Sequence, residues 1–161
     1  MISFSEFKEI AKGLYYKAKG ECVFCKIVGE NDPDKIIYQD ETVAVFPPLK
    51  SGILAEGHLL VIPKEHHKDI FEIPEGTLTN LTAAAKKIAD ELKQNSDITG
   101  MNILHASGKS AQQSVNHFHL HLVPRRDSDG LDLWPDTDYK EENFSENYSK
   151  IKKALEDADT R

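Results

Sequence analysis

Cysteine is scarce in this sequence of 161 residues, which contains only Cys22 and Cys25. One pair is too few for the disulfide framework of a small secreted protein, and in a reducing compartment such a pair more often binds metal or performs redox chemistry. The sequence has no run of about 18 apolar residues that could cross a bilayer. Its N-terminal segment has no basic stretch followed by an apolar one, as a signal peptide requires. These absences predict a cytoplasmic protein with no membrane partner.

The sequence also has no excess of basic over acidic residues. The chain contains 20 lysines and arginines and 27 acidic residues, which gives a formal net charge of −7. Residues 127–161 contain eleven acidic and five basic residues, so this tail carries −6 and the rest of the chain about −1. Binding to nucleic acid or to an anionic membrane surface requires a basic footprint. Neither partner is therefore expected.

Apolar residues make up 39 % of the chain, which is enough for the core of one domain. Helical spacing predicts an N-terminal helical extension within residues 1–20, a long helix over 76–94 and a last helix within the acidic tail, 127–161. Short apolar or strand-like segments predict strands over 35–39, 42–46, 58–63 and 101–105, and strict alternation predicts one over 115–123. These elements predict a single α+β domain over 1–161, with an antiparallel β-sheet flanked by helices.

The most informative segment is HFHLHL, residues 117–122. Because successive side chains of a strand face opposite sides, His117, His119 and His121 would share one face and the apolar residues the other. Near neutral pH an imidazole can serve as nucleophile, acid or metal ligand. The alternative is a half-buried strand with histidines on its solvent side. Three of the seven histidines in one register, after a polar loop, favour a functional site.

The order His-apolar-His-apolar-His-apolar-apolar over residues 117–123 resembles the signature of the histidine-triad (HIT) family. Residues 22–28, 57–66 and 113–115 are also similar to segments of that family, so the resemblance covers about residues 22–126. It implies the family's HIT-like fold, an antiparallel sheet flanked by helices that continues across a homodimer.

The resemblance implies hydrolysis or transfer at the α-phosphate of a nucleotide, with a nucleoside phosphoramidate or a dinucleoside polyphosphate as substrate. His119 would attack phosphorus and form a covalent nucleotidyl-histidine, which water then cleaves. His121 would bond the phosphoryl oxygens, and its backbone carbonyl would help hold His119. His58 would complete the polar network, and Ser114 and Gln113 would donate to the phosphate or the leaving group. The alternative for the last two is ordinary loop solvation.

Substrate contacts are also expected from Ser107 and Phe46, but the chain departs from the family pattern near both. Pro48 occupies the position of a common aspartate that grips the ribose hydroxyls. Ala106 replaces a common asparagine, and Gln112 replaces a glycine, which changes the backbone freedom of that loop. These departures support an alternative function, a zinc-stabilised purine-nucleotide-binding module that has little turnover and serves regulation.

Cys22 and Cys25 supply two thiolates at the spacing of a zinc knuckle, but tetrahedral zinc needs four ligands, and only histidines can complete the set. In the zinc-containing branch of the HIT family, the positions that match His66 and His117 supply them. The resemblance therefore implies a structural Zn²⁺ in a Cys2His2 site that removes His117 from proton chemistry. His67 is expected to be exposed. The alternatives are a redox pair and two small buried cysteines.

Trp134 lies in the acidic tail. HIT proteins often place their C-terminal segment at the active site of the dimer partner, which implies a contact between Trp134 and the ligand. The alternative is a tryptophan that anchors the tail to the body of its own chain.

Overall fold

The computed structural model describes residues 21–49, 52–138, 140, 142 and 144–159. The chain divides into two compact units, Met1–Leu131 and Asp132–Arg161. The described elements of the first unit are α2 (Val23–Glu30), β1 (Tyr38–Gln39), β2 (Val43–Phe46), β3 (Leu59–Pro63), α3 (Glu75–Asn95), β4 (Gly100–Leu104) and β5 (Leu120–Arg125). The second unit contains α4 (Phe144–Asp159). The helix predicted within residues 1–20 lies outside the described residues.

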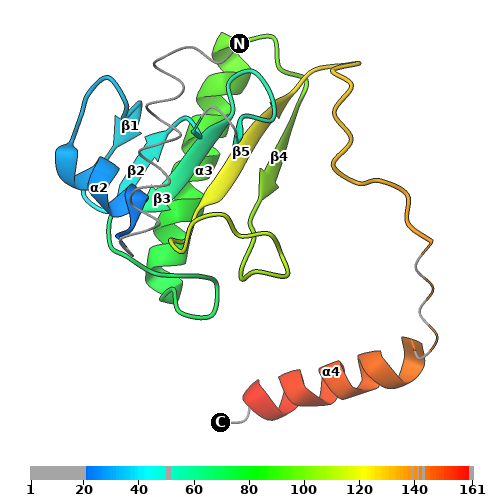
Figure 1. Ribbon diagram of the computed structural model, residues 1–161. Helices are drawn as coiled ribbons and strands as arrows, with labels where there is room; N and C mark the ends of the chain where they lie inside the picture. Colours follow the sequence, from blue (N-terminus) through cyan, green and yellow to red (C-terminus); the bar gives the residue numbers. More distant parts are fainter. Residues whose placement is uncertain (1–20, 50–51, 139, 141, 143, 160–161) are drawn as a thin grey trace. The chain divides into compact units, whose positions relative to one another are not determined.

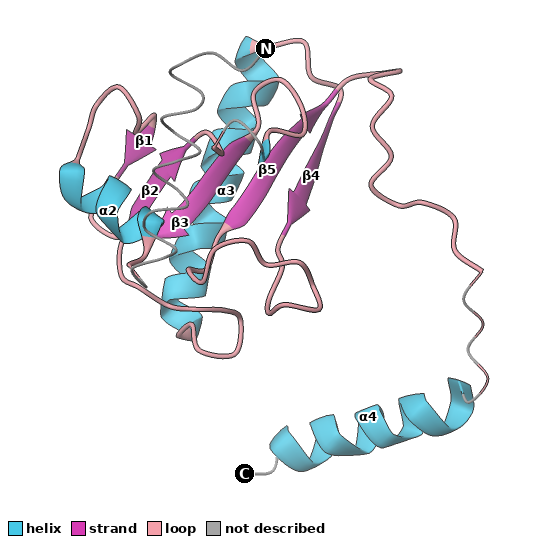
Figure 2. Cartoon of the chain, in the orientation of Figure 1, coloured by secondary structure: helices cyan, strands magenta, loops and turns pink. Residues whose placement is uncertain are grey.

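The strands form one five-stranded antiparallel sheet in the order β1-β2-β3-β5-β4 (Figure 2). Helix α3 packs along one face of this sheet, and α2 lies on the other face (Figure 1). The predicted α+β class with an antiparallel sheet and flanking helices is therefore confirmed. Within the described part of the chain, no helix is long and apolar enough to span a membrane.

Alternating residues of the strands build the two halves of the core. On the α3 face, the buried cluster contains Val43, Val45, Leu59, Val61, Ile73, Leu81, Ala84, Ala85, Phe118, Leu120 and Leu122. On the α2 face, it contains Phe24, Ile27, Ala44, Phe46, Leu60 and Ile62. Because both faces are covered, every residue of β2 and β3 is buried.

Strand β5 begins at Leu120, whereas the sequence pattern predicts a start at Val115. The ladder of β5 with β3 ends at the pair Val61–Leu120, so the preceding residues have no strand partner. Loop groups replace the ladder: the Phe118 N–H donates to the carbonyl of His67 at 2.6 Å. The alternation of side chains nevertheless continues through this segment, which keeps the histidines on the α2 face.

Helix α2 was not predicted, because its eight residues make only about two turns, too few for a helical period to stand out in the sequence. Two caps define it. Cys22 is the N-cap, and its Sγ accepts from the backbone N–H of Cys25 at 3.5 Å. Asn31 ends the helix in the left-handed conformation, with φ of 46°. The helix holds Phe24 and Cys25 above the sheet, next to the histidine segment.

Candidate active site and metal site

Three histidines gather on the α2 face of the sheet. The pairing of Leu60 with His121 brings the start of β3 next to the start of β5. The ring centroids of His58 and His121 are 5.1 Å apart, and those of His119 and His121 are 4.9 Å apart. His58 and His119 are almost completely buried, with exposed fractions of 3 % and 2 %. The sheet register thus assembles these side chains from two strands.

One backbone contact defines the protonation of His119. Its Nδ1 donates to the carbonyl of His117 at 2.7 Å, and because a carbonyl can only accept, the hydrogen of the neutral ring lies on Nδ1. Burial lowers the pKa of His119. The ring is therefore neutral near pH 7, with a lone pair on Nε2. The resemblance implied that the carbonyl of His121 would hold His119. In the structure, the carbonyl of His117 does so.

A second chain of contacts defines the protonation of His121. The Leu54 N–H donates to Nδ1 of His58 at 3.0 Å, so the hydrogen of a neutral His58 lies on Nε2. That Nε2 donates to Nδ1 of His121 at 2.9 Å, which leaves the hydrogen of His121 on its Nε2. Burial lowers the pKa of His58, and burial with the neighbouring histidines lowers that of His121 to about 4. His121 can therefore act as a neutral donor.

Acidification is expected to destabilise the protein through His121. Because its pKa falls from 6.5 to about 4 on folding, the unfolded chain binds a proton between these pH values that the folded chain does not. The contribution of His121 to the free energy of unfolding is thus fully present above 6.5 and is lost as the pH falls to about 4. Urea unfolding near pH 7 and near pH 5 should show a larger loss for the wild type than for His121→Asn. Equal losses would contradict the lowered pKa.

The loop before the histidine segment is fastened by Gln113. Its Oε1 accepts from the Gly108 N–H at 2.7 Å, and its Nε2 donates to the carbonyls of Lys68 and Val115 at 2.7 and 3.0 Å. Its amide therefore holds the loop in place, and the predicted contact with substrate stays a prediction. Ser114 is exposed on the same loop.

Phe46 and Ser107, the two other residues predicted to contact substrate, contact other residues of the protein. Phe46 is 3 % exposed and meets the ring of Phe24 edge-on, with centroids 5.3 Å apart. The hydroxyl of Ser107 accepts from the Ile70 N–H at 2.9 Å and lies 2.6 Å from Nε2 of His105. Their roles toward substrate stay predictions.

Gln112 occupies a conformation that favours glycine. Its φ is 63°, in the left-handed region, where a Cβ costs about 1–2 kcal/mol. Gln112→Gly relieves this cost but adds entropy to the unfolded chain, so we expect the free energy of unfolding to rise by about 0.5–1 kcal/mol. Chemical denaturation measures the change. Gln112→Ala, which keeps a Cβ, is the matched control, and an equal gain from both variants would contradict the explanation.

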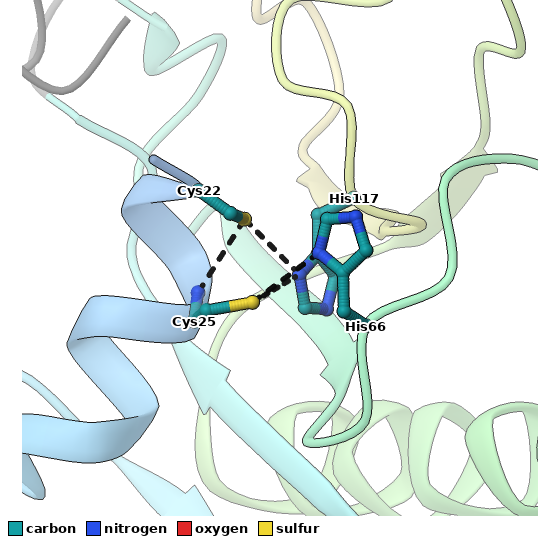
Figure 3. A group of neighbouring side chains, drawn as sticks. All are labelled: Cys22, Cys25, His66 and His117. Atoms are coloured by element: carbon teal, nitrogen blue, oxygen red, sulfur yellow. Dashed lines mark hydrogen bonds between the residues drawn. The ribbon is translucent and has the colours of Figure 1, made fainter. Parts of the chain in front are cut away.

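The structure also brings together the four predicted metal ligands (Figure 3). Cys22 and Cys25 come from the start of α2, His66 follows β3, and His117 precedes β5. The ligand atoms all lie within 4.8 Å of one another. The Nδ1 of His117 is 3.3 Å from Sγ of Cys22, and the Nδ1 of His66 is 3.2 Å from Sγ of Cys25. Ligands of tetrahedral zinc lie about 3.5 Å apart, so these residues can hold such a metal ion.

The protonation of His117 suits a metal ligand. Its Nε2 donates to the carbonyl of Pro63 at 2.8 Å, so Nδ1 presents its lone pair to the two sulfurs. Burial lowers the pKa of His117 to about 4. Burial and the adjacent Cys22 raise the pKa of the Cys25 thiol to about 11, so a metal ion would displace its proton on binding.

The prediction that His67 is exposed is wrong. Its side chain is only 12 % exposed, and its buried Nε2 lies 3.5 Å from Oε2 of Glu65. The loop after His66 turns inward here, since the His67 carbonyl accepts from the Phe118 N–H. His67 is nevertheless outside the metal cluster.

Comparison with known proteins agrees with this geometry. The HIT domain family matches residues 29–128. The chain belongs to the HIT family. Adenosine 5'-monophosphoramidase HNT1 of Saccharomyces cerevisiae is 39 % identical over 123 residues, which cover 73 % of each chain.

Solved HIT structures also share the fold. A HIT family member from Bacillus subtilis has a TM-score of 0.70 and 34 % identity, and the match covers 82 % of this chain and 95 % of that chain. A Zn-bound histidine triad family protein from Mycobacterium smegmatis has a TM-score of 0.64 and 38 % identity, with 73 % and 84 % covered.

Sequence reasoning missed two residues beside His119. Phe24 meets the ring of His119 edge-on, with centroids 5.3 Å apart and an angle of 88°. His105 contacts the His119 backbone through Nδ1. The signal for His105 was a histidine at the end of a predicted strand. Phe24 gave no signal, because the helix that carries it was not predicted.

Proposed function

We propose that this HIT protein is a nucleotidyl hydrolase or transferase that acts at the α-phosphate of a purine nucleotide conjugate. The observation that carries the proposal is the pairing of His119 and His121. A buried, neutral His119 has a lone pair on Nε2, and a neutral His121 beside it has a hydrogen on Nε2. The first can attack phosphorus, and the second can donate to a phosphoryl oxygen.

The reaction proceeds in two displacements. The Nε2 lone pair of His119 forms a bond to phosphorus, and the bond between phosphorus and the leaving group breaks. The leaving group keeps that electron pair and takes up a proton from solvent. Water then attacks the same phosphorus and loses a proton to solvent, the electron pair of the bond to His119 returns to Nε2, and a nucleoside monophosphate leaves. His117 holds the Nδ1 hydrogen of His119 throughout, so Nε2 stays aimed at the substrate.

His58 serves this reaction by setting the protonation of His121. Its own hydrogen is fixed on Nε2 by the Leu54 amide, so the hydrogen bond between the two rings has one direction. Ser114 is exposed on the loop before the histidine segment, and its hydroxyl can donate to the leaving group or the phosphate. Gln113 shapes that loop.

A nucleoside phosphoramidate is the substrate class that the similarity to the yeast phosphoramidase favours. Purified protein is incubated with an adenosine phosphoramidate and, separately, with a diadenosine polyphosphate. We expect release of nucleoside monophosphate, faster from the phosphoramidate. No release above the level of His119→Ala from either compound would reject the enzyme and favour the binding module suggested by Pro48, Ala106 and Gln112.

We further propose that the cluster of Cys22, Cys25, His66 and His117 binds structural Zn²⁺. The donor set is typical of structural zinc, and the Nε2–H of His117 is already bonded to a backbone carbonyl. The ion would tie α2 to the segment that carries His119. We also propose a cytoplasmic homodimer whose sheet continues across the interface, with Trp134 near the partner's ligand.

A further inference from the structure

The backbone carbonyl of His119 lies where the sheet ladder has stopped. The last pair between β4 and β5 is Leu104 with His121, so no strand residue is paired with His119. A side chain takes over: Nδ1 of His105 lies 2.8 Å from this carbonyl oxygen. Because the oxygen can only accept, the hydrogen of the imidazole lies on Nδ1 and is donated to it. His105 thus extends the hydrogen bonding between β4 and β5 beyond the end of the ladder.

The ring of His105 is held on its two other sides. Its face stacks on Phe118, with centroids 4.1 Å apart and an angle of 22° between the planes. Its Nε2 lies 2.6 Å from the Ser107 hydroxyl, which also accepts from the backbone N–H of Ile70 at 2.9 Å. With a neutral imidazole, the hydroxyl donates to Nε2. The donor on Nδ1 therefore has one direction, toward His119.

The backbone carbonyls of His117 and His119, on either side of Phe118, accept different hydrogen bonds. That of His117 fixes the side chain of the nucleophile through Nδ1, and that of His119 is fixed by His105. His119 is therefore held at two points: His105, next to β4, bonds its backbone, and the carbonyl of His117 bonds its ring. A displacement of about 1 Å in a reacting group can cost about a hundredfold in rate.

We propose that His105 is a positioning residue for the nucleophile His119. Its Nδ1–H donates to the carbonyl of His119 and thereby keeps Nε2 of His119 directed at the substrate. Ser107 orients the ring of His105. The assignment rests on the proposed function. It also gives Ser107 a role in the protein's own hydrogen bonding, in contrast to the substrate contact expected from the sequence.

Three substitutions separate the donor from the stacked ring. His105→Phe keeps a ring on Phe118 and loses the donor. His105→Asn keeps an N–H near the position of Nδ1 and loses the stack, and His105→Leu, which has nearly the shape of asparagine, loses both. Hydrolysis of the adenosine phosphoramidate by the full chain gives kcat and KM, and thermal unfolding gives stability for each variant.

We expect kcat to fall about tenfold or more in His105→Phe and His105→Leu, to stay within about threefold of wild type in His105→Asn, and KM to change less than about twofold throughout. If the phenylalanine variant keeps wild-type kcat, or if the asparagine and leucine variants lose kcat equally, the proposal is wrong. If His105→Leu does not fold, the difference in kcat between His105→Phe and His105→Asn still tests the proposal.

Ser107→Ala provides an independent check. A positioning role predicts a lower kcat at unchanged KM, whereas a raised KM at unchanged kcat would contradict it and support a substrate contact. Wild-type turnover is measured first. If the wild type is inactive, the proposed function fails, and if it turns over while His105→Phe is unimpaired, only the positioning role fails.

Discussion

Replacement of His119 by alanine is expected to lower kcat for nucleoside monophosphate release at least about 10⁴-fold, because the proposed mechanism takes its attacking lone pair from this residue. Neither His58 nor His117 can replace it. The Nε2 of His58 is bonded to His121, and His117 uses its Nε2 on Pro63 and turns its Nδ1 to the cysteines. Steady-state assays with the phosphoramidate measure the loss.

Binding of nucleotide is expected to survive this substitution, since Gln113, Ser114 and His121 keep their places. Calorimetric titration of His119→Ala with a nucleoside monophosphate should give a Kd within about tenfold of wild type. Thermal unfolding confirms that the variant is folded. Residual turnover above about one hundredth of wild type would show that His119 is not the nucleophile.

Removal of the proposed zinc is expected to have the second largest effect. Structural zinc sites contribute about 10 kcal/mol or more to folding in small peptides, and even a third of that would lower the Tm of this chain by about 10 °C. Activity should fall too, because His117 contributes its ring to the cluster and its carbonyl to Nδ1 of His119. Unfolding is followed before and after chelation, with zinc added back to restore the Tm.

Adjacent histidines offer a matched control for this experiment. His66 is in the cluster, and His67 is outside it. Elemental analysis should find about one zinc per chain in the wild type and in His67→Ala, and well under one in His66→Ala. Equal metal content in the two variants, or a wild type purified without chelator that contains no zinc, would contradict the Cys2His2 site.

Much of the fold and of the candidate site was predictable from local pattern. Short apolar or strand-like segments located β1 to β4, alternation located β5 apart from its start, and apolar residues at helical spacing located α3 and α4. HFHLHL and the cysteine pair carry their chemistry in the spacing itself. The resemblance to the HIT family added His66 and His117 as metal ligands, and the structure brings all four residues together.

Contacts between distant segments could not be predicted in the same way. The protonation of His121 depends on the Leu54 amide, which is 67 positions away in the sequence. Helix α2 forms where its apolar residues pack on the sheet, and its eight residues are too few for a helical period to stand out in the sequence. The role of His105 depends on where the β4–β5 ladder stops. Each is set by register and packing, which the local pattern does not contain.

The covalent nucleotidyl-histidine is the central claim, and the stereochemistry at phosphorus tests it most directly. A substrate with a chiral α-phosphorothioate is hydrolysed in oxygen-18 water, and the configuration of the released nucleoside phosphorothioate is determined. Each in-line displacement inverts phosphorus, so attack by His119 followed by attack of water predicts overall retention. Overall inversion would show a single displacement by water and would contradict a covalent intermediate.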